Sequence, residues 1–169
     1  MIESILAAMI ASGAYSETAN FEGLRLKSYR DSVGNYTIGI GHHPGVKSNK
    51  KHQTSCKVSL KNSKGQYITN SQAACLYKHN YIQAIKDSTA LIKNFNLQPV
   101  IVQAIINDMS FNMGKGNLSE FRNMLRAVET GNYEQMYYEM VTSKWCLQLD
   151  SRCKYQAEKL MNGVINNGY

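Results

Sequence analysis

The 169-residue sequence has no long uninterrupted apolar run. Its most apolar opening segment, residues 1–14, is too short to span a bilayer, and Glu3 stands where a secretion signal would carry a basic residue. We therefore interpret residues 2–12 as a helix and expect no stable membrane insertion. Because no signal peptide is evident, we expect the protein to be made in the cytoplasm and to reach any extracellular target by another route.

Motifs typical of nucleic-acid-binding proteins are also missing. The sequence has no arginine-rich helix, no zinc-finger spacing and no RNA-binding aromatic motif, so we expect no nucleic-acid partner. Its 19 Lys and Arg residues outnumber its 12 Asp and Glu residues, which gives a net charge of +7. This charge favours attraction to polyanions such as the acidic envelope of bacteria, although solubility alone would also explain it.

Recognisable metal-binding patterns are absent too. No His lies four residues from another His on an expected helix, and the cysteines match no zinc spacing, so we expect no metal and no cofactor. An even number of cysteines allows disulfides in an oxidising compartment. The two pairings considered are Cys146 with Cys153, across a short polar insert, and Cys56 with Cys75, between a β region and a long helix. Four free thiols are the alternative.

Two acidic residues stand out within residues 21–42. Glu22 and Asp31 are separated by eight residues, and Thr37 follows Asp31 after five more. Cleavage of a glycosidic bond requires one carboxylic acid to protonate the leaving oxygen and a second carboxylate to manage the water or the developing cation. The pair would suit glycoside hydrolysis if one group stays protonated and the other ionised, but two such residues alone are a weak signal. The alternative is a pair of solvated surface charges.

The flanking residues favour such a difference between the two carboxyl groups. Gly23 predicts that a helix ends at Glu22 in the left-handed conformation. Glu22 would then lie at the negative end of a helix dipole, which favours its protonated form. Asp31 instead enters the polar turn of residues 32–35, where it should stay ionised.

A strand is predicted directly after that turn. Its apolar residues alternate with Thr37, Gly39 and Gly41, so these three would share one face. A face with one hydroxyl and no bulky side chain would suit a bound sugar chain.

Residues 21–42 resemble the signature of the phage-type lysozymes, glycoside hydrolase family 24. The similarity comprises the run Phe-Glu-Gly-Leu-Arg-Leu, the spaced Asp and Thr, and the run Thr-Ile-Gly-Ile-Gly-His. Residues 68–76 and 107–114 resemble the family more weakly. Three spaced residues inside a matching run are a specific signal. The resemblance implies that the catalytic residues are Glu22, Asp31 and Thr37.

The resemblance also implies an α+β, mainly α, lysozyme-like fold, with residues 1–169 as a single domain. A small β lobe and a helical lobe would flank a cleft. The approximate parts are N-terminal helices in residues 1–27, the β lobe in 28–68, a connecting helix in 69–95 and the helical lobe in 96–169.

Local patterns refine this expectation. Thr69 and Gln72 predict a capping box at the start of the connecting helix. Residues 47–52, rich in lysine, are expected to form a mobile loop. Short strands are expected at residues 58–60 and 66–68, and four further helices at residues 99–114, 119–129, 133–141 and 152–166, with buried methionines.

The resemblance implies further site residues. Phe111 and Asn112 would contact the substrate, and His43 would line the cleft. His42 would be a structural hydrogen-bonding residue, Trp145 would be part of the core, and Arg152 aligns with an Arg that contacts the catalytic Glu.

The function implied is hydrolysis of the β-1,4 bond between N-acetylmuramic acid and N-acetylglucosamine in peptidoglycan, with inversion. Glu22 would be the general acid, while Asp31 would activate a water held by Thr37. A lytic transglycosylase and a non-catalytic murein-binding protein are the alternatives; a water-handling pair argues against the first and an intact triad against the second.

The site of action would be the periplasm or cell wall. Delivery would require a holin, for a phage endolysin, or a secretion system, for an antibacterial toxin with a cognate immunity or inhibitor protein. We expect a monomer.

Overall fold

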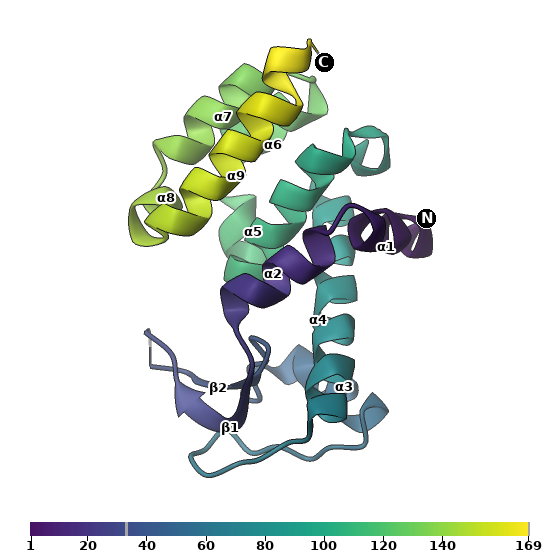
Figure 1. Ribbon diagram of the computed structural model, residues 1–169, viewed down its shortest axis with the longest axis vertical. Helices are drawn as coiled ribbons and strands as arrows, with labels where there is room; N and C mark the ends of the chain where they lie inside the picture. The colour runs from purple at the N-terminus through teal and green to yellow at the C-terminus, as the bar shows by residue number, and fades with distance from the viewer. Residues whose placement is uncertain (33, 169) are drawn as a thin grey trace. The chain divides into compact units, whose positions relative to one another are not determined.

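The computed structural model describes residues 1–32 and 34–168 and is mainly helical, with one small sheet (Figure 1). This confirms the predicted α+β, mainly α, class. The strands are β1 (Arg25–Arg30) and β2 (Tyr36–Gly39). The α-helices are α1 (Ile2–Ala11), α2 (Ala14–Glu22), α3 (Lys50–Ser55), α4 (Asn70–Leu91), α5 (Val100–Ser119), α6 (Arg122–Glu129), α7 (Tyr133–Val141), α8 (Lys144–Gln148) and α9 (Asp150–Gly163). Short 3-10 helices are η1 (Lys47–Asn49), η2 (Phe95–Leu97) and η3 (Ile165–Asn167).

The chain packs as two compact units. The β unit comprises residues 13–83, and the helical unit comprises residues 1–12 together with the chain from Ala84 onward. Helix α4 begins in the β unit and ends in the helical unit. Across residues 1–32 and 34–168, none of the helices combines the length and apolar character needed to cross a membrane.

The β unit is built on the antiparallel pair β1 and β2, whose register places Tyr29 opposite Thr37 and Arg30 opposite Tyr36. Its apolar core contains Ile38 from β2 and Leu76 from α4. The remaining core residues are Cys56, Ile68 and Ala73, with Leu26, Val58, Leu60 and Cys75 packed against them.

The strands predicted at residues 58–60 and 66–68 are wrong. The second segment makes only an isolated bridge between Lys27 and Tyr67, supported by a 3.0 Å bond from the Ile68 N–H to the Leu26 carbonyl. Residues 58–60 form no strand, and their Leu60 N–H donates instead to the side chain of Gln53 at 3.0 Å. Ile68 is buried and Val58 and Leu60 are half-buried against the apolar core, but Tyr67 is exposed and neither segment extends the ladder.

The mobile loop predicted at residues 47–52 is also wrong, because this segment forms η1 and the start of α3. The helix is anchored by buried polar residues, His52 and Gln53, which are 5% and 6% exposed. The His52 Nδ1 atom lies 3.0 Å from the Asn80 Oδ1 atom on α4. Apolar spacing in the sequence therefore does not predict this helix, because its buried residues are polar.

Helix α4 begins with the predicted capping box. The Thr69 N–H donates to Gln72 Oε1 at 3.0 Å, and the Gln72 N–H donates to Thr69 Oγ1 at 3.2 Å. These two bonds satisfy backbone N–H groups that the first helical turn leaves unpaired. The prediction succeeded because the motif depends only on residues three apart.

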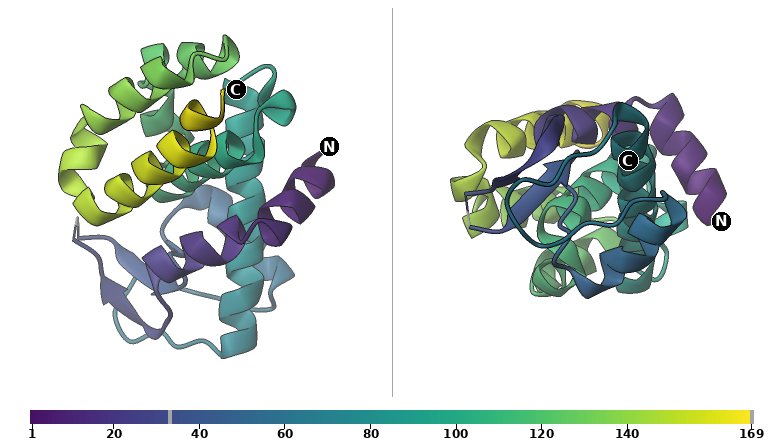
Figure 2. Two further views of the ribbon diagram at one scale, coloured as in Figure 1. Left: turned by 45° about the horizontal axis from the view of Figure 1, so that its top comes forward. Right: turned by 90° about the horizontal axis from the view of Figure 1, so that it is seen from below.

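In the helical unit, α9 contacts α5, α7 and α8, and α7 also packs beside α6 (Figure 1, Figure 2). The predicted methionine core is confirmed for Met109, Met124, Met136 and Met140, which have no exposed surface, whereas Met161 is only half-buried. Helix α5 runs past its predicted end, with a kink at Gly114, where φ is 77° and ψ is 162°. Only glycine adopts this conformation readily, so the motif marks a bend and the next helix starts later than predicted.

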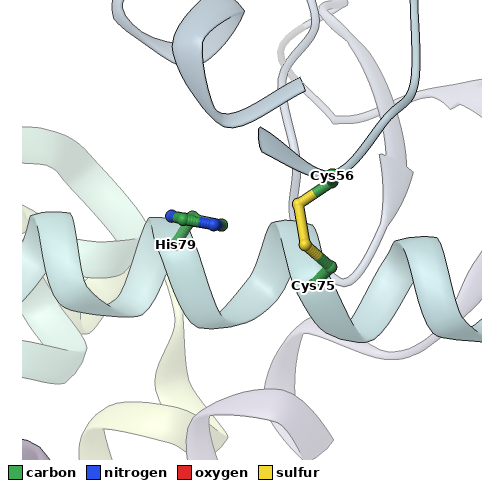
Figure 3. Close-up of side chains that lie close together, drawn as sticks. All are labelled: Cys56, Cys75 and His79. Atoms are coloured by element: carbon green, nitrogen blue, oxygen red, sulfur yellow. A yellow bond between two sulfur atoms is a disulfide. The ribbon is translucent and has the colours of Figure 1, made fainter. Parts of the chain in front are cut away.

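Two disulfides are present, and each lies within one unit. Cys56, just after α3, pairs with Cys75 on α4 in the β unit (Figure 3). Cys146 on α8 pairs with Cys153 on α9 in the helical unit. The insert between the second pair was expected to have no pattern of its own, but it forms α8 and the first residues of α9.

A buried ion pair joins α5 to α9. The Arg152 Nη2 atom lies 2.8 Å from Asp108 Oδ1, and Arg152 Nε lies 2.9 Å from Asp108 Oδ2. The side chains are only 6% and 1% exposed. A two-pronged contact of this kind offsets part of the cost of removing both charges from water.

Removing one member of this pair should strongly destabilise the protein. We expect Asp108→Asn to lower the free energy of unfolding by about 3 kcal/mol, because the Arg152 charge stays buried. The double change Arg152→Met with Asp108→Leu should recover much of that loss. Urea unfolding at neutral pH measures both. Asp150→Asn is the control, because its bond to Lys154 is solvent-exposed; an equal loss there would contradict the prediction.

A second polar cluster lies inside the β unit. His42 has no exposed surface, and its Nδ1 atom lies 3.1 Å from Asn80 Nδ2 while its Nε2 atom lies 3.4 Å from Gln53 Nε2. Burial lowers the pKa of His42 from 6.5 to about 4, against an opposing effect of the Asn80 contact. The imidazole is therefore neutral in the folded protein at neutral pH.

This lowered pKa should make folding sensitive to acid. Between pH 6.5 and about 4 the unfolded chain binds a proton that folded His42 does not, so stability falls as the pH falls through this window. From pH 6.5 to 4.5 the contribution should be about 2 kcal/mol. Comparing the pH dependence of urea unfolding for the parent and His42→Gln isolates it. Identical pH dependence in both proteins would show that His42 does not contribute.

Candidate active site

Glu22 is the last residue of α2 and is half-buried. The Gly23 N–H closes the helix by donating to the Ala19 carbonyl at 3.0 Å. The predicted left-handed stop is wrong in detail, because Gly23 has φ 69° with an extended ψ of 162°. This conformation is accessible essentially to glycine alone and turns the chain directly from the helix towards β1. Glu22 thus lies at a helix C-terminus, beside the negative end of the dipole.

Asp31 follows β1 and is held by a tight turn. Its N–H donates to the Asn35 carbonyl at 2.9 Å, and the Asn35 N–H donates to the Asp31 Oδ1 atom at 2.8 Å. This bond fixes the orientation of the Asp31 carboxyl group. The predicted turn also includes Val33, which lies outside the described residues. The Asp31 side chain is 20% exposed, so its carboxylate is accessible to solvent.

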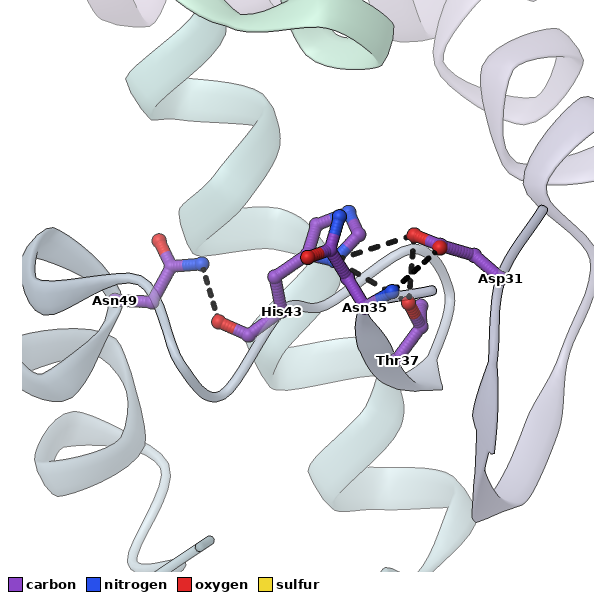
Figure 4. Close-up of polar contacts among 5 residues, drawn as sticks. All are labelled: Asp31, Asn35, Thr37, His43 and Asn49. Carbon is purple, nitrogen blue, oxygen red and sulfur yellow. Dashed lines mark hydrogen bonds and ion pairs between the residues drawn. The ribbon is translucent and has the colours of Figure 1, made fainter. Parts of the chain in front are cut away.

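Thr37 and His43 converge on the second oxygen of Asp31 (Figure 4). The Thr37 hydroxyl lies 3.4 Å from Asp31 Oδ2 and 3.2 Å from His43 Nδ1. His43 Nδ1 is itself 3.9 Å from Asp31 Oδ2. The first two distances are at the long end for direct hydrogen bonds, so the three polar groups form one contiguous cluster.

The backbone of His43 is held by Asn49, the last residue of η1. The Asn49 Nδ2 atom donates to the His43 carbonyl at 3.1 Å (Figure 4). The sequence predicted only that His43 lines the cleft, and its contacts with Thr37 and Asp31 were missed. No local signal could reveal them, because they depend on how the chain returns after β2.

Tyr29 is a second neighbour that the sequence did not reveal. It lies opposite Thr37 in the sheet, so the two side chains share a face, and Arg25 Cζ lies 4.3 Å from the centre of its ring. Burial raises the pKa of Tyr29, Arg25 opposes this, and the charges of Glu22 and Asp31 add to it. The Tyr29 phenol therefore stays protonated and lies within the electrostatic influence of both carboxylates.

The predicted smooth face of Thr37, Gly39 and Gly41 does not form as expected. Strand β2 ends at Gly39, and Gly41 lies in the following turn with φ 65°. Gly39 is buried, and a Cβ atom added there would lie 3.1 Å from the Ile68 side chain. Gly39 therefore allows the backbone to pack closely against the core. The sequence had suggested instead that its missing side chain leaves room for a sugar.

The other predicted site residues belong to the helical unit. Phe111 and Asn112 are half-buried on α5, and Trp145 Nε1 donates to Asn112 Oδ1 at 3.0 Å. Trp145 is 5% exposed, and Arg152 pairs with Asp108 as described above. Substrate contacts by Phe111 and Asn112, and a contact of Arg152 with the catalytic Glu, remain predictions.

The β unit thus brings together a carboxyl group at a helix end and a turn-bound carboxylate with a hydroxyl and an imidazole beside it. In the described part of the chain, neither carboxylate belongs to a cluster with the geometry of a metal site. The two acidic groups have different surroundings, because Glu22 ends a helix and Asp31 accepts hydrogen bonds in a turn. Cleavage of a glycosidic bond uses two carboxyl groups in different roles.

Comparisons with known proteins agree with this chemistry. The family model described as phage lysozyme matches residues 19–163. The chain is 29% identical to probable T4-type lysozyme 2 of Dictyostelium discoideum over 78% of this chain and 83% of that protein. It is 28% identical to the pre-baseplate central spike protein Gp5 of Enterobacteria phage T4, over 86% of this chain and 27% of that protein.

A third relative is the peptidoglycan hydrolase gp36 of Pseudomonas phage phiKMV, which is 27% identical over 82% of this chain and 14% of that protein. The match to the family model includes Glu22, Asp31 and Thr37 and extends across most of the sequence. The chain therefore belongs to the phage lysozyme family of peptidoglycan-hydrolysing glycoside hydrolases.

Proposed function

We propose that the protein hydrolyses the β-1,4 bond between N-acetylmuramic acid and N-acetylglucosamine in peptidoglycan, with inversion at the anomeric carbon. The observation that carries the proposal is the cluster of Asp31, Thr37 and His43. It supplies a carboxyl group with two further polar groups suited to hold a water beside it.

Glu22 is the general acid in this mechanism. From its position at the C-terminus of α2, Glu22 donates a proton to the oxygen of the leaving sugar. As the bond between the anomeric carbon and that oxygen breaks, positive charge develops on the remaining sugar. The ionised Asp31 carboxylate stabilises this charge while it orients the water.

The water attacks the anomeric carbon from the side opposite the departing oxygen, so the configuration inverts. Its proton passes to Asp31, while Thr37 and His43 fix its orientation by hydrogen bonds. The reaction consumes one water and restores the enzyme when Asp31 returns a proton to solvent and Glu22 takes one up.

A lytic transglycosylase is the competing chemistry. Such an enzyme needs one acid and no water, and the sugar's own hydroxyl closes a 1,6-anhydro ring. The cluster around Asp31 would then have no role, which favours hydrolysis. Mass spectrometry of the products separates the two reactions, because hydrolysis adds one water to each product pair and transglycosylation adds none.

Replacing the acid should remove activity and leave the fold intact. Glu22→Gln keeps the shape of the side chain but cannot donate the proton, so peptidoglycan clearance should fall by about 10²–10⁴-fold. Glu120→Gln is the matched control, because that carboxylate is 72% exposed at the end of α5. A folded Glu22→Gln protein that keeps more than about a tenth of the parent rate would refute the assignment.

Substitutions of Asp31 and Thr37 should reduce activity to different degrees. Asp31→Asn preserves the acceptor for the Asn35 N–H but removes the base, so activity should fall by about 10²-fold or more. Thr37→Val keeps the buried volume and removes only the hydroxyl, and we expect a smaller loss of about tenfold. Clearance assays with thermal melts measure both. A larger loss for Thr37→Val than for Asp31→Asn would contradict the proposed base.

We propose further that the enzyme acts in the periplasm or cell wall as a monomer, after delivery by a holin or a secretion system. Two disulfides and a net charge of +7 suit an oxidising, anionic environment. The similarity covers most of one relative but only 27% and 14% of two longer phage proteins. This range is compatible with an endolysin and with a toxin domain that requires an immunity protein.

A further inference from the structure

The imidazole ring of His79 lies next to the Cys56–Cys75 disulfide. The two sulfur atoms and one ring nitrogen of His79 all lie within 4.8 Å of one another (Figure 3). Cys75 and His79 are four residues apart on α4 and so lie on the same face of the helix. Cys56 reaches them from the end of α3, with its Cα atom 5.7 Å from that of Cys75.

The imidazole of His79 is held in place by its neighbours. The ring of His79 stacks on the ring of His52, with 5.4 Å between their centres and 18° between their planes. His52 is anchored in turn, because its Nδ1 atom lies 3.0 Å from Asn80 Oδ1. On the other side, both cysteines pack against the apolar core of the β unit. A site with an ordered imidazole and an apolar wall is typical of protein metal centres.

We propose that, in the reduced protein, Cys56, Cys75 and His79 bind one Zn²⁺ ion. Two thiolates and one imidazole are ligands that zinc prefers, and a solvent molecule can take the fourth tetrahedral position because Cys75 and His79 are half-exposed. Tetrahedral geometry at Zn–S bonds of about 2.3 Å places two sulfur ligands about 3.8 Å apart. The three ligand atoms already lie within 4.8 Å of one another, so reduction need only let the two sulfur atoms separate to that distance.

The disulfide and the metal site exclude each other. A dithiol reductant transfers two electrons and two protons to the Cys56–Cys75 bond, which yields two thiols and the oxidised form of the reductant. Zinc binding then displaces both thiol protons and forms two Zn–S bonds. Either state links α3 to α4, so the same connection persists in a reducing cytoplasm and in an oxidising compartment.

The inference does not depend on the proposed peptidoglycan chemistry, because it concerns different residues and can be tested without substrate. The full-length double variant Cys146→Ser with Cys153→Ser provides the background, since only one cysteine pair then remains. After reduction with a phosphine, which is not itself a thiol ligand, Co²⁺ serves as a spectroscopic probe for the zinc site. Thiolate-to-cobalt absorption should saturate at one ion per chain, and Zn²⁺ should abolish it.

Two comparisons locate the ion. The oxidised background protein should give no thiolate-to-cobalt absorption, and adding His79→Ala should weaken Co²⁺ binding in the reduced protein at least about tenfold. Adding His43→Ala instead is the matched control and should leave binding unchanged. Zn²⁺ should also raise the melting temperature of the reduced background protein but not of its His79→Ala form.

Equal Co²⁺ affinity with and without His79, or no thiolate absorption in the reduced background protein, would overturn the proposal. Binding that persists after Cys56→Ser and Cys75→Ser would place the ion elsewhere and would overturn it as well. Peptidoglycan clearance is measured separately, so failure of the metal site and failure of the proposed catalytic function give different results.

Discussion

The amide of Asn80 is the contact on which the β unit depends. It bonds to His42, which follows the sheet, and to His52 on α3, so one side chain of α4 contacts both segments. Leaving this half-buried amide or the buried imidazoles unpaired would be costly, which makes the arrangement specific as well as stabilising. His43 is positioned next to Thr37 because its neighbour His42 is fixed in this way. The same contact brings the end of α3, and with it Cys56, to the surface of α4.

The two proposed catalytic carboxyl groups are placed by two small elements, the end of α2 and the β1–β2 hairpin. Asp31 gains its backbone hydrogen bond from a turn of a few residues, and Glu22 gains its surroundings from the end of α2. The different surroundings of the two carboxyl groups therefore come from local backbone geometry, while His43 reaches Asp31 because the chain turns back after β2.

Much of this could be predicted where the physical cause is local. The capping box at Thr69 and the buried methionine rows were found because they rest on residues three or four positions apart. The helix that starts near Lys50 was missed because its anchors are polar and gain their partners only on folding. The predicted strands near Val58 and Tyr67 failed because apolar alternation shows which residues are buried but not whether a ladder continues. Tyr29 was missed because strand register cannot be derived from one sequence.

The helical unit is discontinuous in the sequence, because α1 belongs to it and contacts α5 although the β unit lies between them in the chain. This order matters during synthesis on the ribosome. The β unit has all of its residues once the chain has reached the middle of α4, whereas α1 must wait for α5 before it can bury its apolar side. Vectorial synthesis thus favours early completion of the unit that carries Glu22 and Asp31. Helix α1 is therefore synthesised before the β unit but gains its partner α5 only after that unit is complete.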